Sequence, residues 1–404
     1  MIRLPMTAIE VVNAASVAPA LPESAFPARY CNLPGARLRF GDRVDRLGFY
    51  LRALDPLADR AVEALPPGAA GHALIGAALD GEARVPNALA ELVESARVVP
   101  PWVEWDRIDR GGRFFLRTGL VGGIVLGARA LVVSYASPGG NKPLAFSGRL
   151  TEAAAPRLNE TARFVRAVVR SSGMRVGGEG WKLTLRVRLI HAQIRRMLAA
   201  SPRWNSDAWG APINQHDMVA ASLVFSVVTL GGVRLLGIDV SEDESDDFMH
   251  LWRWVSHVIG VDPVLFPVTE AEAVRLSDLI GATQAAPDDD SRALTSALLE
   301  HGLGHPDLET RDMAQRTLGT ARAVCRHLVG DEVADGLRIP KTRERFLVPA
   351  AVATVRALEQ ARKRSPRLEK AMVDRGTRYW DRVIEQGLVY ATTDFELPSA
   401  LANG

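Results

Sequence analysis

Cysteine is scarce in this chain, with only Cys31 and Cys325 among 404 residues. Two isolated cysteines argue against a disulfide framework and a cysteine-based metal site, although one bridge between them stays open. A reducing compartment is the simpler interpretation, so we expect a cytoplasmic location. The N-terminus agrees, because Glu10 and Asn13 interrupt the apolar residues of segment 1–22, where a secretory signal would be continuous. We expect this segment to be a flexible or docking arm.

The chain also lacks a charge excess and a long apolar run. It has 49 basic and 47 acidic residues, and no basic run alternates with aromatic residues. Nucleic acid is therefore not an expected partner. The most apolar stretch, residues 119–135, is interrupted by Arg129 and is shorter than the roughly 20 residues that cross a bilayer. We expect no transmembrane segment and predict that this stretch is a buried helix.

Familiar catalytic motifs are missing as well. The sequence has no Gly-x-Gly-x-x-Gly that opens a βα unit, no phosphate-binding loop, no His-Glu-x-x-His and no paired Glu-x-x-His. These absences argue against a dinucleotide-binding enzyme, a P-loop nucleotidase, a zinc protease of that type and a di-iron helix bundle.

Helical periodicity, by contrast, recurs in block after block, and strand-like alternation is rare. This pattern predicts an all-α fold, and 47% hydrophobic residues suffice for a large core. We expect an N-terminal arm and helices over residues 1–100, a core over 101–285 and a C-terminal helical extension of the same domain over 286–404. The predicted helices include residues 43–65, 102–135, 150–171, 183–200 and 215–230, and one short strand is predicted near 233–240.

Residues 186–198 carry the clearest functional signal. Read as a helix, they place His191 on an apolar stripe, with Arg188 and Arg195 about one turn to either side. Flanking cations disfavour a protonated imidazole, and a neutral imidazole can donate a lone pair to a metal. The arginines could neutralise an anionic cofactor, and haem combines an iron, an apolar macrocycle and two carboxylates. The alternative is a core histidine bonded to a backbone carbonyl, which is the commoner role of a lone histidine.

A second group of residues lies upstream. Arg157 and Thr161 are four residues apart, so they are neighbours on one helix face that continues to Phe164. A cation and a hydroxyl beside an apolar wall suit a pocket for dioxygen, because both donate hydrogen bonds to developing negative charge. In the alternative interpretation, the arginine pairs with a carboxylate and the threonine bonds its own backbone.

His250 and His257 are a weaker candidate. They lie seven residues apart on one helix face, which could supply half of a metal site. Because Trp252 and Trp254 are close by, an aromatic-rich interface is the favoured interpretation.

Several short motifs follow one another in a fixed order. They are Ser147-Gly148-Arg149-Leu150, Arg157-x-x-x-Thr161 with Phe164-Val165, Arg186-x-Arg188-Leu189-Ile190-His191-Ala192 with Arg195, Gly210-x-Pro212-Ile213-Asn214-Gln215-x-Asp217, Phe225-Ser226, Leu251-Trp252-Arg253-x-Val255 and Gly260-Val261-Asp262-Pro263. A fainter match follows at residues 328–332. Over residues 115–270 the set resembles the rubber oxygenase catalytic-domain family, which includes the latex clearing proteins and the fungal oxygenase that shortens the mycophenolic acid side chain.

The resemblance implies a mainly helical domain with a globin-like core that holds b-type haem, and hence iron. By the same resemblance, His191 would be the axial ligand. Arg157 and Thr161 would line the haem pocket, and Arg188 and Arg195 would meet the haem propionates.

One position departs from the family pattern. In latex clearing proteins a lysine can precede the pocket threonine and close the sixth coordination site of the iron. Here that position is Glu160, so lysine ligation does not carry over. Glu160 could take a proton from the substrate, or it could face solvent.

We therefore expect a haem-dependent oxygenase, a dioxygenase-like oxidoreductase that acts with O2 on a small, apolar, unsaturated lipid or terpenoid. Oxidative cleavage of a C=C bond is the reaction that the family suggests. Rubber itself is not the expected substrate, because no secretion signal is evident. Two alternatives stay open: a peroxide-driven haem peroxidase or peroxygenase, and a non-enzymatic haem-binding or sensor protein. The sequence does not predict an oligomeric state.

Overall fold

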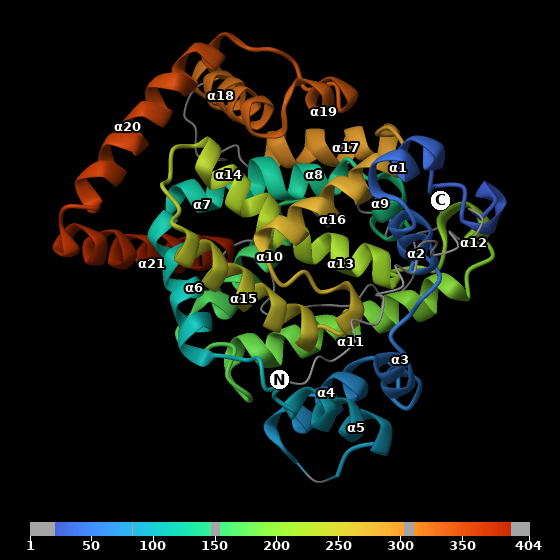
Figure 1. The fold of residues 1–404 in the computed structure, drawn as a ribbon. Coiled ribbons are helices and arrows are strands. Elements are labelled where there is room, and N and C mark those ends of the chain that lie inside the picture. Colours follow the sequence, from blue (N-terminus) through green and yellow to red (C-terminus); the bar gives the residue numbers. More distant parts are fainter. Residues whose placement is uncertain (1–20, 83, 147–153, 303–310, 389–404) are drawn as a thin grey trace, which may run out of the picture.

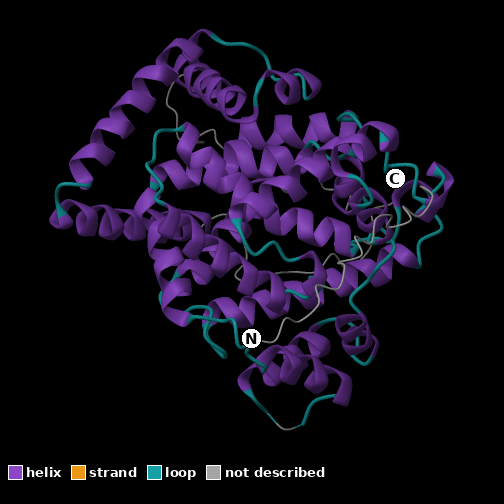
Figure 2. Cartoon of the chain, in the orientation of Figure 1, coloured by secondary structure: helices purple, strands orange, loops and turns teal. Residues whose placement is uncertain are grey.

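The structure is a computed structural model that describes residues 21–82, 84–146, 154–302 and 311–388. Within these ranges every regular element is a helix and none is a strand (Figure 2). The predicted all-α fold is therefore confirmed. The predicted arm up to residue 20 and the motif at residues 147–150 lie outside the described residues.

The helices fall into three groups along the chain. Those before residue 100 are η1 Glu23–Ala25, α1 Leu33–Phe40, α2 Arg43–Phe49, α3 Pro56–Glu63, α4 Ala69–Asp80 and α5 Asn87–Arg97. The central ones are α6 Trp105–Thr118, α7 Leu120–Val125, η2 Leu126–Ala130, α8 Leu131–Tyr135, α9 Pro138–Ala145, α10 Ala154–Val169, α11 Glu179–Ala199, α12 Ser206–Trp209, α13 Gln215–Leu223, η3 Val224–Val228, α14 Thr229–Leu235, α15 Glu242–Val258, η4 Pro263–Leu265 and α16 Glu270–Ala282. The last are α17 Asp289–Ala297, η5 Leu298–Gly302, α18 Arg311–Val329, α19 Asp331–Gly336, η6 Arg343–Leu347, α20 Val348–Arg362 and α21 Pro366–Leu388.

The three groups pack against one another. Helix α3 lies on α11, α1 lies on α16, and α21 lies on both α6 and α10. In Figure 1, α4 and α5 form one end of the molecule, and α18 and α19 form the opposite end. Helix α20 runs along the outer edge and leads back to α21 (Figure 1). The helices at both ends of the chain therefore flank the central ones.

The α6–α15 pair is the most extensive helix contact in the described residues. Phe248 of α15 stacks on Phe115 with ring centroids 5.9 Å apart and meets Phe114 edge-on at 5.5 Å. A side chain at Gly111 would collide with the backbone carbonyl of Asp247, so glycine allows the two helices to approach this closely. Burial of these aromatic rings anchors the core.

The prediction of one helix over residues 102–135 is wrong, because the chain turns sharply at Gly119. Gly119 has φ +50°, a conformation that glycine adopts at little cost. As a result, α6 and the Leu120–Tyr135 run differ in direction by 89°. The second run contains the π-helix η2, which packs against the π-helix η3. Such π-helical turns are frequent at functional sites.

Two other local predictions are also wrong. The helix predicted over residues 43–65 is divided into α2 and α3 by a loop that ends at Asp55-Pro56. The strand predicted near residues 233–240 is absent, because α14 continues to Leu235 and a loop follows. In both cases a Pro or Gly near the break set the local structure more strongly than the hydrophobic pattern did.

One helical run in the described residues, Gln215–Leu235, is long and apolar enough to cross a membrane. Most of it is buried inside the protein, as expected for a core helix. Trp105–Thr118 and Leu120–Tyr135 would qualify only as one sharply bent pair.

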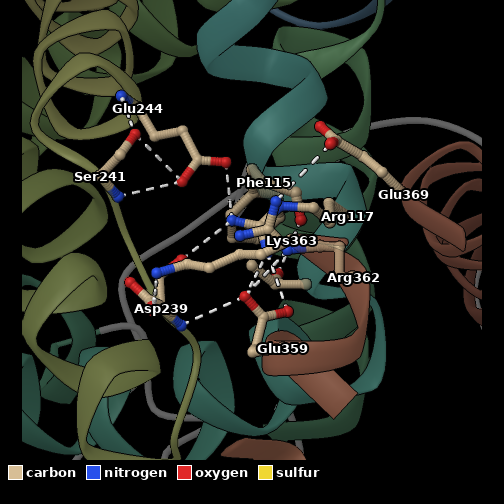
Figure 3. A network of polar contacts seen from close by, with 10 residues as sticks. Phe115, Arg117, Asp239, Ser241, Glu244, Glu359, Arg362, Lys363 and Glu369 are labelled. Atoms are coloured by element: carbon tan, nitrogen blue, oxygen red, sulfur yellow. Dashed lines mark hydrogen bonds and ion pairs between the residues drawn. The ribbon is translucent and has the colours of Figure 1, made fainter. Parts of the chain in front are cut away.

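A buried ion network ties α20 to the core (Figure 3). Arg117 of α6 donates from Nη1 to both carboxylate oxygens of Glu359, at 2.9 and 2.8 Å, and both side chains are 1% exposed. Arg117 also donates to Glu244 at 2.7 Å, and Arg362 donates to Glu359 at 3.1 Å. Because each charged group in this network has an oppositely charged partner, the network can be buried away from water. It holds the outer helix α20 against α6 and the start of α15.

Replacing Glu359 with glutamine should strongly destabilise the protein, because the buried Arg117 guanidinium loses its main counter-charge. We expect the free energy of unfolding to fall by about 3–5 kcal/mol. Urea denaturation followed by circular dichroism measures this change. The control is Asp374→Asn, which breaks an exposed pair with Lys370 and should cost less than about 1 kcal/mol. Equal costs for the two variants would contradict the assignment.

Candidate functional site

Helix α11 carries the histidine that the sequence singled out. Glu179 in its first turn complements the helix dipole, and the helix ends before Ser201-Pro202. Its fully covered face is apolar over most of its length and includes Trp181, Leu185, Leu189, Ala192 and Leu198. The stripe beside that face is only partly covered by protein and consists of Val187, Ile190, His191 and Ile194. An apolar stripe left partly open can accept an apolar ligand.

The imidazole of His191 is held neutral. Its Nδ1 atom is buried and has no hydrogen-bond partner. Burial, and after it the nearby charge of Arg195, lower the pKa of His191 to about 4, while Asp55 opposes the shift. The core-histidine alternative predicts a bond to a carbonyl, and His191 makes none among the described residues. A neutral, unbonded imidazole on an apolar stripe is suited to bind a metal.

Arg188 does not point to an open space but to helix α3. Its Nε and Nη2 donate to the two oxygens of Asp55 at 2.6 and 2.9 Å. Its Nη1 donates to the backbone carbonyl of Val258 at 3.3 Å. Asp55 also caps α3 by accepting from the Ala58 N–H. A contact between Arg188 and a propionate would therefore require this buried pair to open.

Two of the three side-chain nitrogens of Arg195 have a hydrogen-bond partner. Its Nε donates to Asp59 at 2.8 Å, and its Nη1 donates to the carbonyl of Ile213 at 2.7 Å. The remaining Nη2 is buried and has no partner. His191 and Arg195, one helical turn apart, thus each keep one buried polar atom unsatisfied. Such atoms are costly unless a bound group completes them.

Helix α10 packs against α11 and carries the second group of predicted residues. Thr161 is half-buried, and its hydroxyl makes no hydrogen bond in the described part of the chain. By contrast, Thr184 and Thr295 donate to the carbonyl four residues earlier, as the alternative interpretation required of Thr161. The Thr161 hydroxyl therefore remains available to a ligand.

The other two predicted residues of α10 are less fully defined. Glu160 is half-buried and is engaged in an interaction of its own. Arg157 lies within α10, but its side chain is outside the described residues. Their roles stay predictions.

An aromatic wall, Phe164, Phe225 and Trp252, follows Thr161. Phe164 lies on α10 about one turn after Thr161, and its ring centroid is 6.1 Å from that of Phe225 in η3. Phe225 stacks on Trp252 of α15 at 5.1 Å with an interplanar angle of 12°. The wall joins three helices that are far apart in sequence and begins about one helical turn from Thr161.

His250 and His257 lie in an aromatic interface, as the favoured interpretation predicted. Trp102 meets both imidazole rings edge-on, at 5.7 and 6.3 Å. The Nε2 of His250 accepts the backbone N–H of Glu104 at 3.0 Å, so it is unavailable to a metal. The described residues contain no cluster of three or more histidine, cysteine or acidic side chains that could hold a metal ion. A haem-type site, which needs one protein ligand, does not depend on such a cluster.

Sequence analysis missed Asp55 and Asp59, the partners of the two arginines. They lie 120 or more residues before α11, and nothing in their local pattern indicates that contact. The only available signal was Asp55-Pro56, which marks the start of a helix.

Three comparisons with known proteins place these features in context. Residues 115–357 match the family model described as "ER-bound oxygenase mpaB/B'/Rubber oxygenase, catalytic domain". The rubber oxygenase of Streptomyces sp. (strain K30) is 25% identical over 274 residues, which cover 66% of this chain and 64% of that protein. The match thus spans less than two thirds of the relative's length. The solved structure of latex clearing protein LCP in the closed state shares the fold, with a TM-score of 0.56 and 20% identity, covering 82% of this chain and 91% of that one.

The electrostatics of His191 can be tested in protein prepared free of any cofactor. By NMR titration, its imidazole should protonate only near pH 4, well below its ordinary pKa of about 6.5. Arg195→Met removes a neighbouring positive charge and should raise the pKa of His191, whereas Asp55→Asn removes a negative charge and should lower it. A wild-type midpoint at or above pH 6.5, or shifts of opposite sign, would show that the ring is not in this environment.

Proposed function

Because this chain belongs to the mpaB/B' and rubber oxygenase catalytic-domain family, we propose that it is a haem-dependent oxygenase that oxidises an apolar, unsaturated substrate with dioxygen. The observation that carries the proposal is the state of His191. Its imidazole is neutral, lacks a hydrogen-bond partner at Nδ1 and lies on a partly open apolar stripe. A lone neutral histidine is the simplest protein ligand for haem iron.

The residues around His191 fit a haem group. His191 would bind the iron, and the unpartnered Nη2 of Arg195 would donate to a propionate one turn away. Val187, Ile190 and Ile194 would lie against the macrocycle. Arg188 would act differently from the sequence prediction, by holding α11 against Asp55 rather than by contacting haem. When bound, haem would supply the activation of dioxygen.

On the substrate side, the free hydroxyl of Thr161 would donate a hydrogen bond to an oxygen atom that gains negative charge. Arg157, one turn before it, would add a positive charge to the same face. The aromatic wall would exclude water and provide the surface for an apolar substrate. Glu160 is the candidate proton acceptor, because it is the half-buried carboxylate beside Thr161.

The reaction that suits these residues is oxidative cleavage of a C=C bond. One O2 is consumed, the double bond is broken, and each of its carbons becomes a carbonyl carbon. This reaction balances without an external reductant. A reducing, cytoplasmic location is part of the proposal, and it is supported by Cys31 and Cys325, which are both free thiols.

Absorption spectroscopy tests the cofactor. The purified protein should show a Soret band, and His191→Ala should lose most of it because the iron loses its protein ligand. His327→Ala, which changes an exposed histidine, is the matched control and should retain the band. A folded but colourless parent protein, even after haem is supplied, would favour the haem-free helical alternative.

Turnover tests the role of Thr161. Thr161→Val should lower kcat by about 10²–10³-fold, the effect of losing one hydrogen-bond donor to developing charge, while the Soret band remains. Thr354→Val, on the exposed side of α20, should leave kcat unchanged. Consumption of O2 rather than H2O2 separates an oxygenase from a peroxygenase. A haem-loaded parent that turns over neither oxidant would point to the carrier or sensor alternative.

A further inference from the structure

Arg129 is the one charged residue in the apolar run Leu120–Tyr135, and the site described above does not use it. It lies in the π-helix η2 and is half-buried. Its Nε donates to the backbone carbonyl of Val228, in the π-helix η3, at 3.0 Å. No other hydrogen bond of its side chain occurs in the described part of the chain.

Among the described residues, Arg129 also has no counter-charge. Every fully buried arginine among the described residues has a carboxylate within 4 Å; the pairs are Arg29–Asp217, Arg117–Glu359, Arg188–Asp55, Arg195–Asp59, Arg326–Asp331 and Arg362–Glu359. No carboxylate of the described residues pairs with Arg129. Burial alone lowers its pKa below the ordinary arginine value, without an opposing acidic neighbour. A half-buried guanidinium without a counter-charge is costly, and an anion at its free end would lower that cost.

Two glycines of α14 leave space for the Arg129 side chain. It crosses two glycines of α14: a Cβ at Gly232 would lie 2.8 Å from Arg129 Cδ, and a Cβ at Gly231 would lie 3.6 Å from Nη2. A side chain at Gly232 would therefore displace the Arg129 side chain, whereas one at Gly231 would only touch its end. Its two terminal nitrogens make no hydrogen bond, and neither is sealed from solvent. They form the planar fork that binds a carboxylate through two parallel bonds.

Arg129 is close in the fold to the aromatic wall. Val228, its backbone partner, follows Phe225 by about one turn of η3. Phe225 contacts Phe164, which lies one turn from Thr161 on α10. The guanidinium is therefore joined through one helix to the surface on which the apolar substrate would lie.

We infer that Arg129 is an anchor for the carboxylate of an otherwise apolar molecule bound in this core. The inference rests on the proposed function for its placement beside a substrate surface. One positive charge suits a singly charged carboxylate, whereas a phosphate dianion would need a second free cation. Arg234, the nearest other cation on α14, is already paired with Glu270. The carboxylate could belong to an acidic substrate, such as an unsaturated fatty or terpenoid acid, or to a haem propionate.

Binding to the protein as isolated distinguishes an acidic substrate from other occupants. Isothermal titration with oleic acid and with its methyl ester gives the preference for a free carboxylate. The wild type should bind the acid roughly ten- to a hundredfold more tightly, Arg129→Gln should lose this preference, and Arg129→Lys should keep part of it. Arg356→Gln, at an exposed arginine of α20 without an ion pair, is the matched control and should resemble the wild type.

The rate at which haem is lost to a scavenger protein tests whether the carboxylate bound by Arg129 is a haem propionate. If a propionate meets Arg129, Arg129→Gln should release haem roughly ten- to a hundredfold faster than the wild type, and the acid preference should be absent. If a substrate acid meets Arg129, the rates should be equal. The inference is overturned if Arg129→Gln changes neither measurement. A colourless protein that still prefers oleic acid through Arg129 would reject the proposed function and leave the anchor standing.

Discussion

The pairing of α11 with α3 is the constraint on which the candidate site depends. Arg188 and Arg195 lie seven residues apart, nearly two full turns, so they leave α11 in almost the same direction. Asp55 and Asp59, at the start of α3, receive them in two buried or half-buried ion pairs. His191 lies between the arginines in sequence and is offset from them by roughly 40–60° around the helix. Holding the arginines against α3 therefore turns the imidazole toward the neighbouring, partly open stripe.

This arrangement divides two roles among the arginines: some hold helices together, and others keep nitrogens that can bind an anionic group. The sequence alone assigned both arginines to an anionic cofactor, because an apolar helix with flanking cations gives no other explanation for them. In the structure, Arg188 is fully satisfied by protein, whereas Arg195 keeps one donor and Arg129 keeps two. Paired charges hold the helices together, and the free nitrogens of Arg195 and Arg129 are the candidates for contact with a ligand. The number of free donors on a buried arginine is therefore more informative than its distance in sequence from the histidine.

The sequence was sufficient for features that depend on neighbouring residues. Helical periodicity predicted the all-α fold and α11, and spacing placed Thr161 and Phe164 on one face. It was not sufficient where distant segments decide the outcome. The neutral state of His191 is caused by burial and by the charge of Arg195, and it is opposed by Asp55, which lies more than 130 residues away. The residues on both sides of Gly119 are apolar and have helical periodicity. This pattern therefore indicated one continuous helix and gave no sign of the turn. Arg129 was visible only as an interruption, because the lack of a counter-charge is a property of the folded interior.

The ion pairs of Arg117, Arg188 and Arg195 extend beyond the residues that the family model matches. The matched region, residues 115–357, contains His191, Arg188, Arg195 and Arg117 but not Asp55, Asp59 or Glu359, which pair with the three arginines. Asp55 and Asp59 precede it, and Glu359 follows it by two residues. Without them, Arg188 and Arg195 would be buried without a carboxylate partner, at a cost of several kcal/mol each, and Arg117 would keep only Glu244. The N-terminal helices and α20 are therefore more than additions to a finished catalytic domain. They complete its ion pairs: α3 pairs with the two arginines beside His191, and α20 pairs with Arg117.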